Sequence, residues 1–294
     1  MEELKNCPIC GSTALKTYNN AIDYTVSRET FTIVKCLACN LHFTNPRPAS
    51  KTIGKYYESE DYISHSNTTT GIVNKIYHLA KKIAINNKIK LIESLNLKNR
   101  NLLDIGCGTG SFLGEISKNK WIVTGIEPNE AARKIAISNF NLKVVPETEI
   151  NTFRSDSFSV ITLWHVLEHV HELRTKITEI NNLLIPGGYA IIAVPNYTSW
   201  DAQHYKEYWA AYDVPRHLYH FSPEVIKDLF EKNGFTHYKS LPMKMDSFYV
   251  SMLSEKYKKS TFGIFKALIN GFRSNINAKN DAEKYSSVIY IFKK

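Results

Sequence analysis

The stretch 101–113, NLLDIGCGTGSFL, contains the residue types that could hold a nucleotide-like ligand. Three glycines, Gly106, Gly108 and Gly110, alternate with other residues directly after an apolar run that contains Asp104. Glycine adopts positive φ and lets a ligand approach the backbone closely. An apolar run, a glycine turn and a helix-compatible segment predict the first strand, turn and helix of a nucleotide-binding parallel sheet. The spacing differs from GxGxxG and no Walker lysine follows, so we do not expect a pyrophosphate here.

A second apolar segment, 121–129, reads as the next strand and contains an acid at its end. This acid, Glu127, lies 21 residues after Gly106 and is followed by Pro128. An acid at about this distance from the first glycine is suited to bind ribose hydroxyls. The glycine turn and Glu127 together predict a nucleoside site.

Four of the five cysteines occur as two CxxC pairs near the N-terminus. Cys7 and Cys10 form one pair, and Cys36 and Cys39 form the other after 25 intervening residues. Two CxxC pairs together supply four thiolates in a tetrahedral arrangement, which predicts a Zn²⁺ in a zinc ribbon. Because no coordination position stays open for a substrate, we expect this metal to be structural. We expect Cys107, inside the glycine turn, to be a small packing residue and not a fifth ligand.

Histidines are the natural candidates for a general base near neutral pH. His165 and His169 follow a β-rich run, 158–163, where the carboxyl end of a strand would place them beside a ligand. His217 and His220 lie in an aromatic-rich segment, 196–222, which is a candidate substrate loop. The sequence does not rank these histidines, and each of them has a structural alternative.

The elements that must position these groups alternate between strand and helix. Apolar β-rich runs recur near residues 102, 122, 142, 158, 189, 237 and 286, with helical patterns between most of them. Ser222 and Pro223 predict the start of one of these helices. The pattern predicts an α/β fold: a Rossmann-like, mostly parallel seven-stranded sheet with helices on both faces, plus a small N-terminal zinc ribbon.

We therefore expect three parts of the chain. Residues 1–48 form the zinc ribbon, and 49–100 form a linker or lid, with Tyr56, Tyr57, Tyr62 and His65, followed by a leading helix. Residues 101–294 form the main domain, with the substrate loop at 196–222 and an insertion at about 254–285. The apolar part of this insertion has flanking Lys and Arg residues, so it reads either as an interfacial helix or, as we expect, as a helix that packs on its own domain.

The formal net charge is +9, with the excess concentrated in 74–100 and 239–294. The lysines are scattered and not clustered with aromatic residues, so we favour a solvated basic surface over a nucleic-acid site. A peripheral membrane contact stays an alternative. No apolar run reaches membrane-spanning length and no secretory signal is apparent, which predicts a cytoplasmic protein.

The motifs resemble those of a known family. DIGCGTG and GIEPN look like the first motif and partner acid of class I S-adenosylmethionine-dependent methyltransferases, and LWHVLEHV, LLIPGG, VPN and DVPRHLYHFSPE resemble the group that includes ubiquinone-biosynthesis O-methyltransferases. The resemblance implies that the glycine loop faces the methionine part of S-adenosylmethionine, that Glu127 binds ribose and that His165 lies at the reactive end. The implied cofactor-binding residues are Asp104, Gly106, Cys107, Gly108, Gly110, Glu127, Pro128, Trp164 and His165.

Two features limit how far this resemblance extends. Many relatives have Gly-Asp after the third strand where this chain has Pro146 and Glu147, so the adenine contact stays open, with Glu147 as one option. A zinc ribbon joined to this domain also resembles sugar C-methyltransferases that act on nucleotide-linked deoxysugars. Those enzymes carry a much longer C-terminal domain, so their substrate is not transferred to this chain.

The leading hypothesis is therefore an S-adenosylmethionine-dependent methyltransferase that modifies a small-molecule or saccharide-type acceptor, which includes lipid-linked acceptors. His165, His217 and His220 are the predicted catalytic residues. One alternative is an RNA methyltransferase that uses the zinc ribbon for docking, although the ribbon carries as many acidic as basic residues. Another is a non-catalytic protein that senses the cofactor or binds a partner.

Overall fold

The computed structural model describes residues 1–58 and 72–294, and the side chains of the first long helix from residue 81 on. Tyr62 and His65 of the predicted lid lie outside this range. The strands are β1 (Leu15–Ile22), β2 (Thr30–Cys36), β3 (His42–Thr44), β4 (Asn101–Ile105), β5 (Ile122–Ile126), β6 (Lys143–Val145), β7 (Phe158–Trp164), β8 (Leu184–Pro195), β9 (Tyr219–His220), β10 (Thr236–Pro242) and β11 (Ser287–Lys293). The α-helices are α2 (Ile72–Glu93), α3 (Ser111–Ser117), α4 (Glu130–Phe140), α5 (Leu173–Leu183), α6 (Trp200–Tyr205), α7 (Pro223–Glu231), α8 (Asp246–Tyr257) and α9 (Gly263–Ala278).

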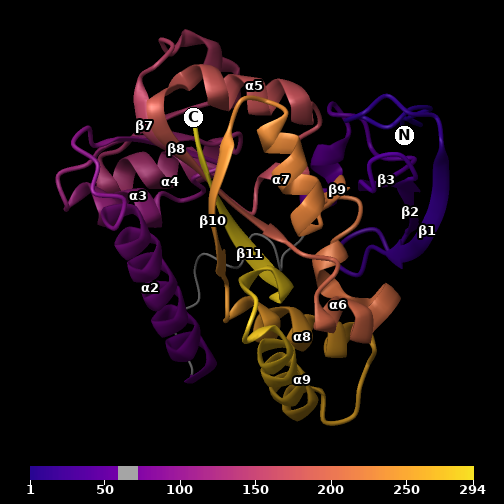
Figure 1. Cartoon of the computed structure of the whole chain (residues 1–294). Helices are drawn as coiled ribbons and strands as arrows, with labels where there is room; N and C mark the ends of the chain where they lie inside the picture. Colours follow the sequence, from indigo (N-terminus) through magenta and orange to yellow (C-terminus); the bar gives the residue numbers. More distant parts are fainter. Residues whose placement is uncertain (59–71) are drawn as a thin grey trace.

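The main sheet has the order β10-β11-β8-β7-β4-β5-β6; Figure 1 labels β10, β11, β8 and β7 of this sheet. Strands β4 to β8 pair in parallel, whereas β11 is antiparallel to both of its neighbours. This arrangement confirms the predicted Rossmann-like, mostly parallel seven-stranded sheet. The glycine turn joins β4 to α3 near the middle of the sheet, where the strand order reverses and ligands bind in open α/β sheets.

Alternating residues of the central strands face two different helical layers. Leu103, Ile161 and Ile192 belong to the core that contains apolar side chains of α5 and α7. Leu102 belongs to a second core, with side chains of α2 and α3. Successive side chains of a strand point to opposite faces of the sheet, so the two cores lie on opposite faces. Because each core contains helical side chains, helices cover both faces as predicted.

Helix starts follow local capping signals. Ser222 precedes α7, its hydroxyl accepts a hydrogen bond from Val225 N at 3.4 Å, and Pro223 occupies the first turn. Asn129 caps α4 in the same way through Ala132 N at 3.0 Å. The cap predicted at Ser222 is therefore present, and the cap at Asn129 places the start of α4 directly after Glu127.

A second sheet, with the order β1-β2-β3-β9, combines the N-terminal ribbon with part of the predicted substrate loop. Strand β9 pairs with β3 through His42 opposite His220, and Leu218 O accepts a hydrogen bond from Thr44 N at 3.0 Å. Figure 1 shows β9 beside the indigo N-terminal strands. The sequence predicts the ribbon at 1–48, but its sheet is completed by residues of the predicted substrate loop, because β3 leaves an edge that β9 covers.

Helices α8 and α9 pack against each other and form the lower end of the molecule in Figure 1. They supply most of the insertion predicted at about 254–285. In the part of the chain that the structure describes, none of the helices combines the length and apolar character needed to cross a bilayer.

Candidate active site

The glycine turn after β4 adopts the left-handed backbone that its sequence predicts. Gly106 has φ of +73° and Gly110 has φ of +76°. A Cβ on Gly106 would lie 2.4 Å from Val166 Cγ2, whereas a Cβ on Gly108 would meet nothing within 4 Å. Gly106 is therefore required by packing against the end of β7, and Gly108 leaves open space beside the backbone.

Glu127, at the end of β5, lies against this turn. Its carboxylate accepts hydrogen bonds from Gly108 N at 2.8 Å and from Asn129 N at 2.9 Å. Burial raises the pKa of Glu127, and these two backbone donors oppose that rise. Each carboxylate oxygen holds one of these bonds and keeps acceptor capacity for a ligand hydroxyl. The two predicted halves of the nucleoside site are therefore in direct contact.

Asp104, near the end of β4, is buried and held by a neighbouring strand. Thr162 Oγ1 donates a hydrogen bond to Asp104 Oδ1 at 2.6 Å. Burial raises the pKa of Asp104 to about 7, against the lowering effect of this bond and of the Lys88 charge. A cation close to Asp104 would therefore favour the ionised form of this buried acid.

Lys88 on α2 was not singled out from the sequence. Its Nζ lies 4.3 Å from the centre of the Trp164 ring, and burial lowers the pKa of this lysine while Asp104 and Asp246 oppose that effect. Trp164 Nε1 is buried with no hydrogen-bond partner within the described residues. The site therefore offers a cation and an unused N–H donor at the carboxyl end of β7.

His165 follows Trp164 with φ of 57°, which is uncommon for a residue other than glycine. Its Nε2 lies 3.0 Å from Asp246 Oδ2 and its Nδ1 lies 3.3 Å from Glu168 Oε1. Burial alone would lower the pKa of His165, but the two carboxylates outweigh burial and raise the pKa to about 10. His165 is thus an imidazolium near neutral pH, with both ring nitrogens directed at acids. Asp246 was not identified from the sequence because it follows a predicted strand without any motif.

Glu168, His169 and His217 form a cluster next to His165. One ligand atom of each lies within 4.8 Å of the others, and Glu168 is fully buried. Burial would raise the pKa of Glu168, but the surrounding histidines lower it. A hydrogen bond of 2.8 Å from Leu218 N to Glu168 O connects the segment around residue 168 with the segment around residue 217. The structure therefore brings together histidines that the sequence places about fifty residues apart.

Two of these histidines, His169 and His217, use the same ring nitrogen to contact a backbone carbonyl. His217 Nδ1 lies 2.9 Å from the carbonyl oxygen of Ala211, so this nitrogen carries the proton, because a carbonyl only accepts. The other ring nitrogen, Nε2, lies 3.9 Å from Asp213 Oδ2 and 4.0 Å from Glu168 Oε1. His169 Nδ1 similarly donates to Arg216 O at 3.1 Å.

His220 lies instead in the ribbon sheet. Thr44 Oγ1 donates its only proton to His217 O at 2.8 Å, so His220 Nε2 donates to Thr44 Oγ1 at 3.3 Å. Burial lowers the pKa of His220, and its ring packs edge-on against Tyr212. This environment is that of a neutral structural histidine, and the catalytic role predicted for His220 stays a prediction without support from its geometry.

The remaining predicted cofactor residues have defined positions. Cys107 Sγ occupies the space beside Gly125, where a Cβ would lie 2.5 Å away. Pro128 O accepts a hydrogen bond from Arg133 Nη1 at 2.7 Å, which fixes the chain after Glu127. Glu147 forms an ion pair with Lys176 at 3.0 Å, and an adenine contact by Glu147 stays a prediction.

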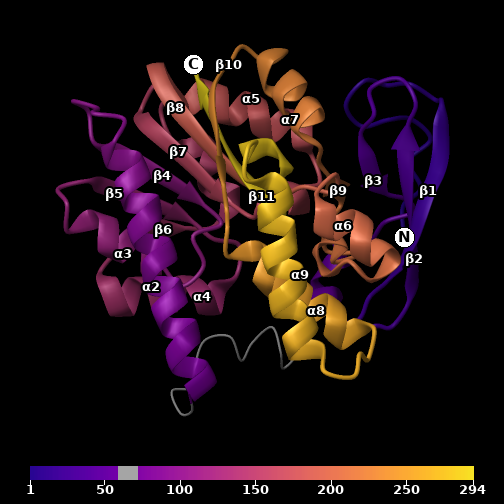
Figure 2. The same cartoon turned by 60° about the horizontal axis from the view of Figure 1, so that its bottom comes forward.

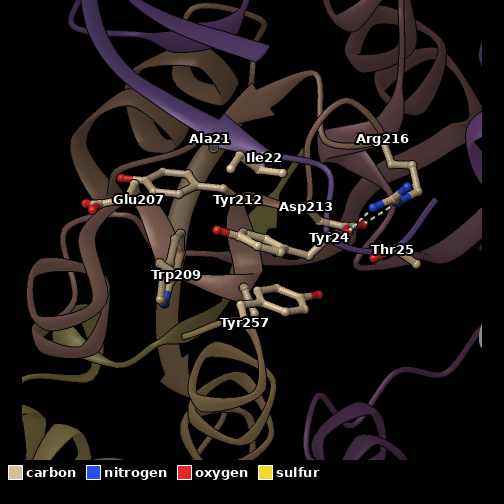
Figure 3. A pocket seen from close by; sticks show the side chains of 11 residues that line it. Ala21, Ile22, Tyr24, Thr25, Glu207, Trp209, Tyr212, Asp213, Arg216 and Tyr257 are labelled. Atoms are coloured by element: carbon tan, nitrogen blue, oxygen red, sulfur yellow. Dashed lines mark hydrogen bonds and ion pairs between the residues drawn. The ribbon is translucent and has the colours of Figure 1, made fainter. Parts of the chain in front are cut away.

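The aromatic segment forms a third core against the N-terminal turn after β1. Figure 3 shows Tyr24 beside Tyr257, whose ring centres are 4.4 Å apart, and the carboxylate of Asp213 directed at Arg216. Trp209 Nε1 donates to Asp201 at 2.8 Å. The hollow that these residues line has a volume of about 10 Å³, room for about one water. In this conformation the aromatic residues act as a core and leave no substrate-sized pocket there.

Arg216 joins three parts of the chain within this core. Its Nη2 donates to Asp23 at 3.0 Å and to Asp213 at 2.6 Å, and its Nη1 donates to Tyr56 O at 2.8 Å. The side chain is 1% exposed. The ribbon, the segment before the leading helix and the predicted substrate loop therefore share one buried cation.

The four paired cysteines converge. Cys7 Sγ lies 3.5 Å from Cys39 Sγ, Cys10 Sγ lies 3.6 Å from Cys36 Sγ, and all four atoms lie within 4.8 Å of one another. Sulfurs around a tetrahedral Zn²⁺ with bonds of about 2.3 Å would be about 3.8 Å apart. The thiol positions fit a single Zn²⁺.

Comparisons with known proteins agree with this architecture. The first solved structure compared is an S-adenosylmethionine-dependent methyltransferase, possible histamine N-methyltransferase, from Thermotoga maritima, with a TM-score of 0.51 and 20% identity over 76% of this chain and 96% of that one. A second, from Archaeoglobus fulgidus, has a TM-score of 0.50 and 22% identity over 72% of this chain and 94% of that one. The protein has the class I methyltransferase fold, which these structures share.

A family model described as a methyltransferase domain matches residues 78–240, more than half of the chain. The chain belongs to this methyltransferase-domain family. Among curated relatives, a ubiquinone biosynthesis O-methyltransferase from Coxiella burnetii is 32% identical over 34% of this chain and 46% of its own length. One from Hydrogenovibrio crunogenus is 24% identical over 52% of this chain and 61% of its own length. The match to the Coxiella relative thus spans less than half of that protein.

Proposed function

We propose that this protein transfers a methyl group from S-adenosylmethionine to a small-molecule acceptor. The observation that carries this proposal is the hydrogen bond from Gly108 N to the Glu127 carboxylate at 2.8 Å. It places a carboxylate with free acceptor capacity beside an open stretch of glycine backbone, which is the combination that a nucleoside with two ribose hydroxyls requires.

The residues around this contact fit the other parts of the cofactor. S-Adenosylmethionine supplies, when bound, a sulfonium with a transferable methyl group. Glu127 would bind the ribose, and the open backbone at Gly108 would lie along the ligand. Lys88 is a cation suited to a methionine carboxylate, and Asp104 is an acid suited to the ammonium group of the same moiety. Trp164 Nε1 is a buried N–H donor that has no hydrogen-bond partner within the described part of the chain. Buried donors are normally hydrogen-bonded, which supports a bound ligand that accepts a hydrogen bond from Trp164.

Among the predicted bases, His217 has the arrangement that supports proton removal from an acceptor. Its Nδ1 is committed to the Ala211 carbonyl, so its Nε2 can accept a proton, and the buried Glu168 carboxylate would stabilise the resulting imidazolium. His165 is already charged between Asp246 and Glu168, so it is suited to place positive charge near a polar acceptor and not to remove its proton. A hydroxyl of a saccharide-type or lipid-linked molecule fits this chemistry.

We further propose that the four-cysteine cluster binds one structural Zn²⁺. All four ligands are thiolates, which leaves no open coordination position for substrate. Because β9 belongs to the same sheet as the ribbon, the metal would also hold the chain that contains His217.

The cofactor assignment is tested by titration calorimetry of the full chain with S-adenosylhomocysteine. Glu127→Gln keeps the size of the side chain but removes its charge, and we expect affinity to fall about 10-fold to 100-fold. Glu130→Gln is the matched control, because Glu130 is an exposed acid three residues further along and should not affect binding. Equal affinity of wild type and Glu127→Gln would refute the ribose assignment.

The acceptor is tested by incubating the protein with methyl-labelled S-adenosylmethionine and a fractionated cell extract. We expect label in small polar molecules or in the lipid fraction. Label found in RNA alone would favour the RNA methyltransferase alternative. No transfer despite cofactor binding would favour a non-catalytic cofactor sensor.

A further inference from the structure

Helix α9 exposes its large apolar side chains and buries its small and polar ones. The buried positions are Ala267, Asn270, Gly271, Ser274 and Ala278. The exposed apolar positions of the helix are Ile264, Phe265, Leu268, Ile269, Phe272 and Ile276. Phe265 is 68% exposed and Phe272 is 61% exposed. A helix that packs only on its own domain shows the opposite distribution.

The buried side of α9 is fully used by contacts within the protein. A Cβ on Gly271 would lie 2.6 Å from Phe248 Cδ1 and 2.9 Å from Phe248 Cα, so glycine permits close packing of α9 on α8. Ser274 donates to Asp201 at 2.7 Å and Asn270 donates to Glu255 at 3.1 Å. The helix cannot rotate to bury its phenylalanines without breaking these contacts, so the exposed face is fixed.

The apolar surface extends beyond α9. Phe262, in the turn before α9, is 74% exposed, and Met245 and Met252, next to and on α8, are exposed as well. Bulky apolar side chains exposed in this number on two adjacent helices mark an interaction site. Figure 2 shows α9 running along the outside of the molecule with α8 beside it.

Exposed basic residues lie in the same stretch of chain as these apolar residues, and acidic residues are absent from it. Lys258, Lys259, Lys266, Arg273 and Lys279 are exposed, and the sequence has no Asp or Glu between Glu255 and Asp281. The region therefore combines exposed bulky apolar groups with a net positive charge. This is the composition of helices that lie in the interface of an anionic membrane.

We propose that the exposed face of α8 and α9 docks on the surface of an anionic lipid bilayer. A second copy of this chain is a poorer occupant, because a twofold contact through the same face would oppose one cluster of lysines to another. An anionic bilayer complements both features: its headgroups pair with the cations and its acyl region accepts the phenylalanines. Since α8 begins at Asp246, which contacts His165, docking would hold the candidate active site close to the lipid surface.

The test uses the full chain and flotation with vesicles of phosphatidylcholine, with or without phosphatidylglycerol. We expect binding to the vesicles that contain phosphatidylglycerol, and weaker binding at high salt. The variant Phe265→Gln/Phe272→Gln should bind at least about tenfold more weakly and still fold, because both side chains are exposed. Lys266→Glu/Arg273→Glu should lose binding to a similar extent.

Control variants distinguish binding through this surface from nonspecific adsorption of the protein to vesicles. Ile122→Gln removes an apolar side chain that is 71% exposed on another part of the molecule, and Lys98→Glu reverses an exposed charge outside α8 and α9. Both should bind vesicles like the wild type. Failure of the wild type to bind, or equal binding by the Phe265→Gln/Phe272→Gln variant, would overturn the proposal. Self-association that this variant abolishes, without vesicle binding, would overturn it in favour of a second copy. Vesicle binding needs no methyl transfer, so its outcome is independent of the proposed activity.

Discussion

Asp246 Oδ2 lies 3.0 Å from His165 Nε2, which joins the first residue of α8 to the residue after β7. This pair couples the end of the main sheet to the C-terminal helical insertion. Glu168 approaches the other ring nitrogen of His165, so the imidazole lies between two acids. The charge of His165 therefore depends on a residue 81 positions away in sequence.

The first prediction concerns Asp246→Asn. Removing this charge should lower the pKa of His165 from about 10 by roughly 1–3 units, which histidine NMR titration would measure. Because the folded pKa exceeds the ordinary value of 6.5, the pair stabilises the wild type fully below pH 6.5 and loses this effect as pH rises towards 10. Asp228→Asn, at an exposed acid on α7, is the control. An unchanged His165 titration in Asp246→Asn would show that this acid does not set the charge.

The second prediction concerns Arg216. Arg216→Ala leaves Asp23 and Asp213 without their buried cation, and we expect the free energy of unfolding to fall by about 3–5 kcal/mol. Arg174→Ala, at an exposed arginine on α5, should change it by about 0.5 kcal/mol or less. Urea unfolding followed by circular dichroism measures both. A loss below about 1 kcal/mol in Arg216→Ala would mean that the three segments hold together without this side chain.

The third prediction concerns the glycine turn. Gly106→Ala places a Cβ 2.4 Å from Val166 at a position with φ of +73°, so the turn must shift. We expect a loss of stability of about 1–3 kcal/mol and at least about tenfold weaker binding of S-adenosylhomocysteine. Gly54→Ala has open space around it and should affect neither quantity. Full cofactor affinity in Gly106→Ala would contradict a role for this turn.

The fourth prediction concerns Zn²⁺. Cys36→Ser should abolish stoichiometric zinc, measured by plasma mass spectrometry, while Cys107→Ser should retain it. Because β9 pairs with β3, we also expect faster hydrogen exchange at residues 217–221 after zinc removal. Zinc loss without any change at 217–221 would mean that β9 does not depend on the metal.

The fifth prediction concerns His217. If its Nε2 removes the acceptor proton, His217→Gln should lower kcat by about 10²-fold to 10⁴-fold and leave binding of S-adenosylhomocysteine unchanged. The loss should be smaller at high pH, where the acceptor ionises without help. His204→Gln, at an exposed histidine on α6, is the control. A normal kcat in His217→Gln would assign proton removal to another group.

The sequence by itself determined the fold class, the pairing of the cysteines, and the positions of the glycine turn and of Glu127 at the ends of two successive strands. These features depend on local patterns: strand and helix periodicity, the paired spacing of CxxC, and a turn at a fixed distance from the next strand end. Short-range geometry fixes such arrangements, so residue types and spacing are enough to predict them.

Tertiary structure decided which distant groups meet. The pairing of β9 with β3 attached the predicted substrate loop to the ribbon and placed His220 opposite His42. The packing of α8 brought Asp246 to His165. It also decided that α9 buries its small residues and exposes its phenylalanines. None of these contacts has a signature in sequence spacing, because each depends on how separate elements pack together and not on the order of residues within one element.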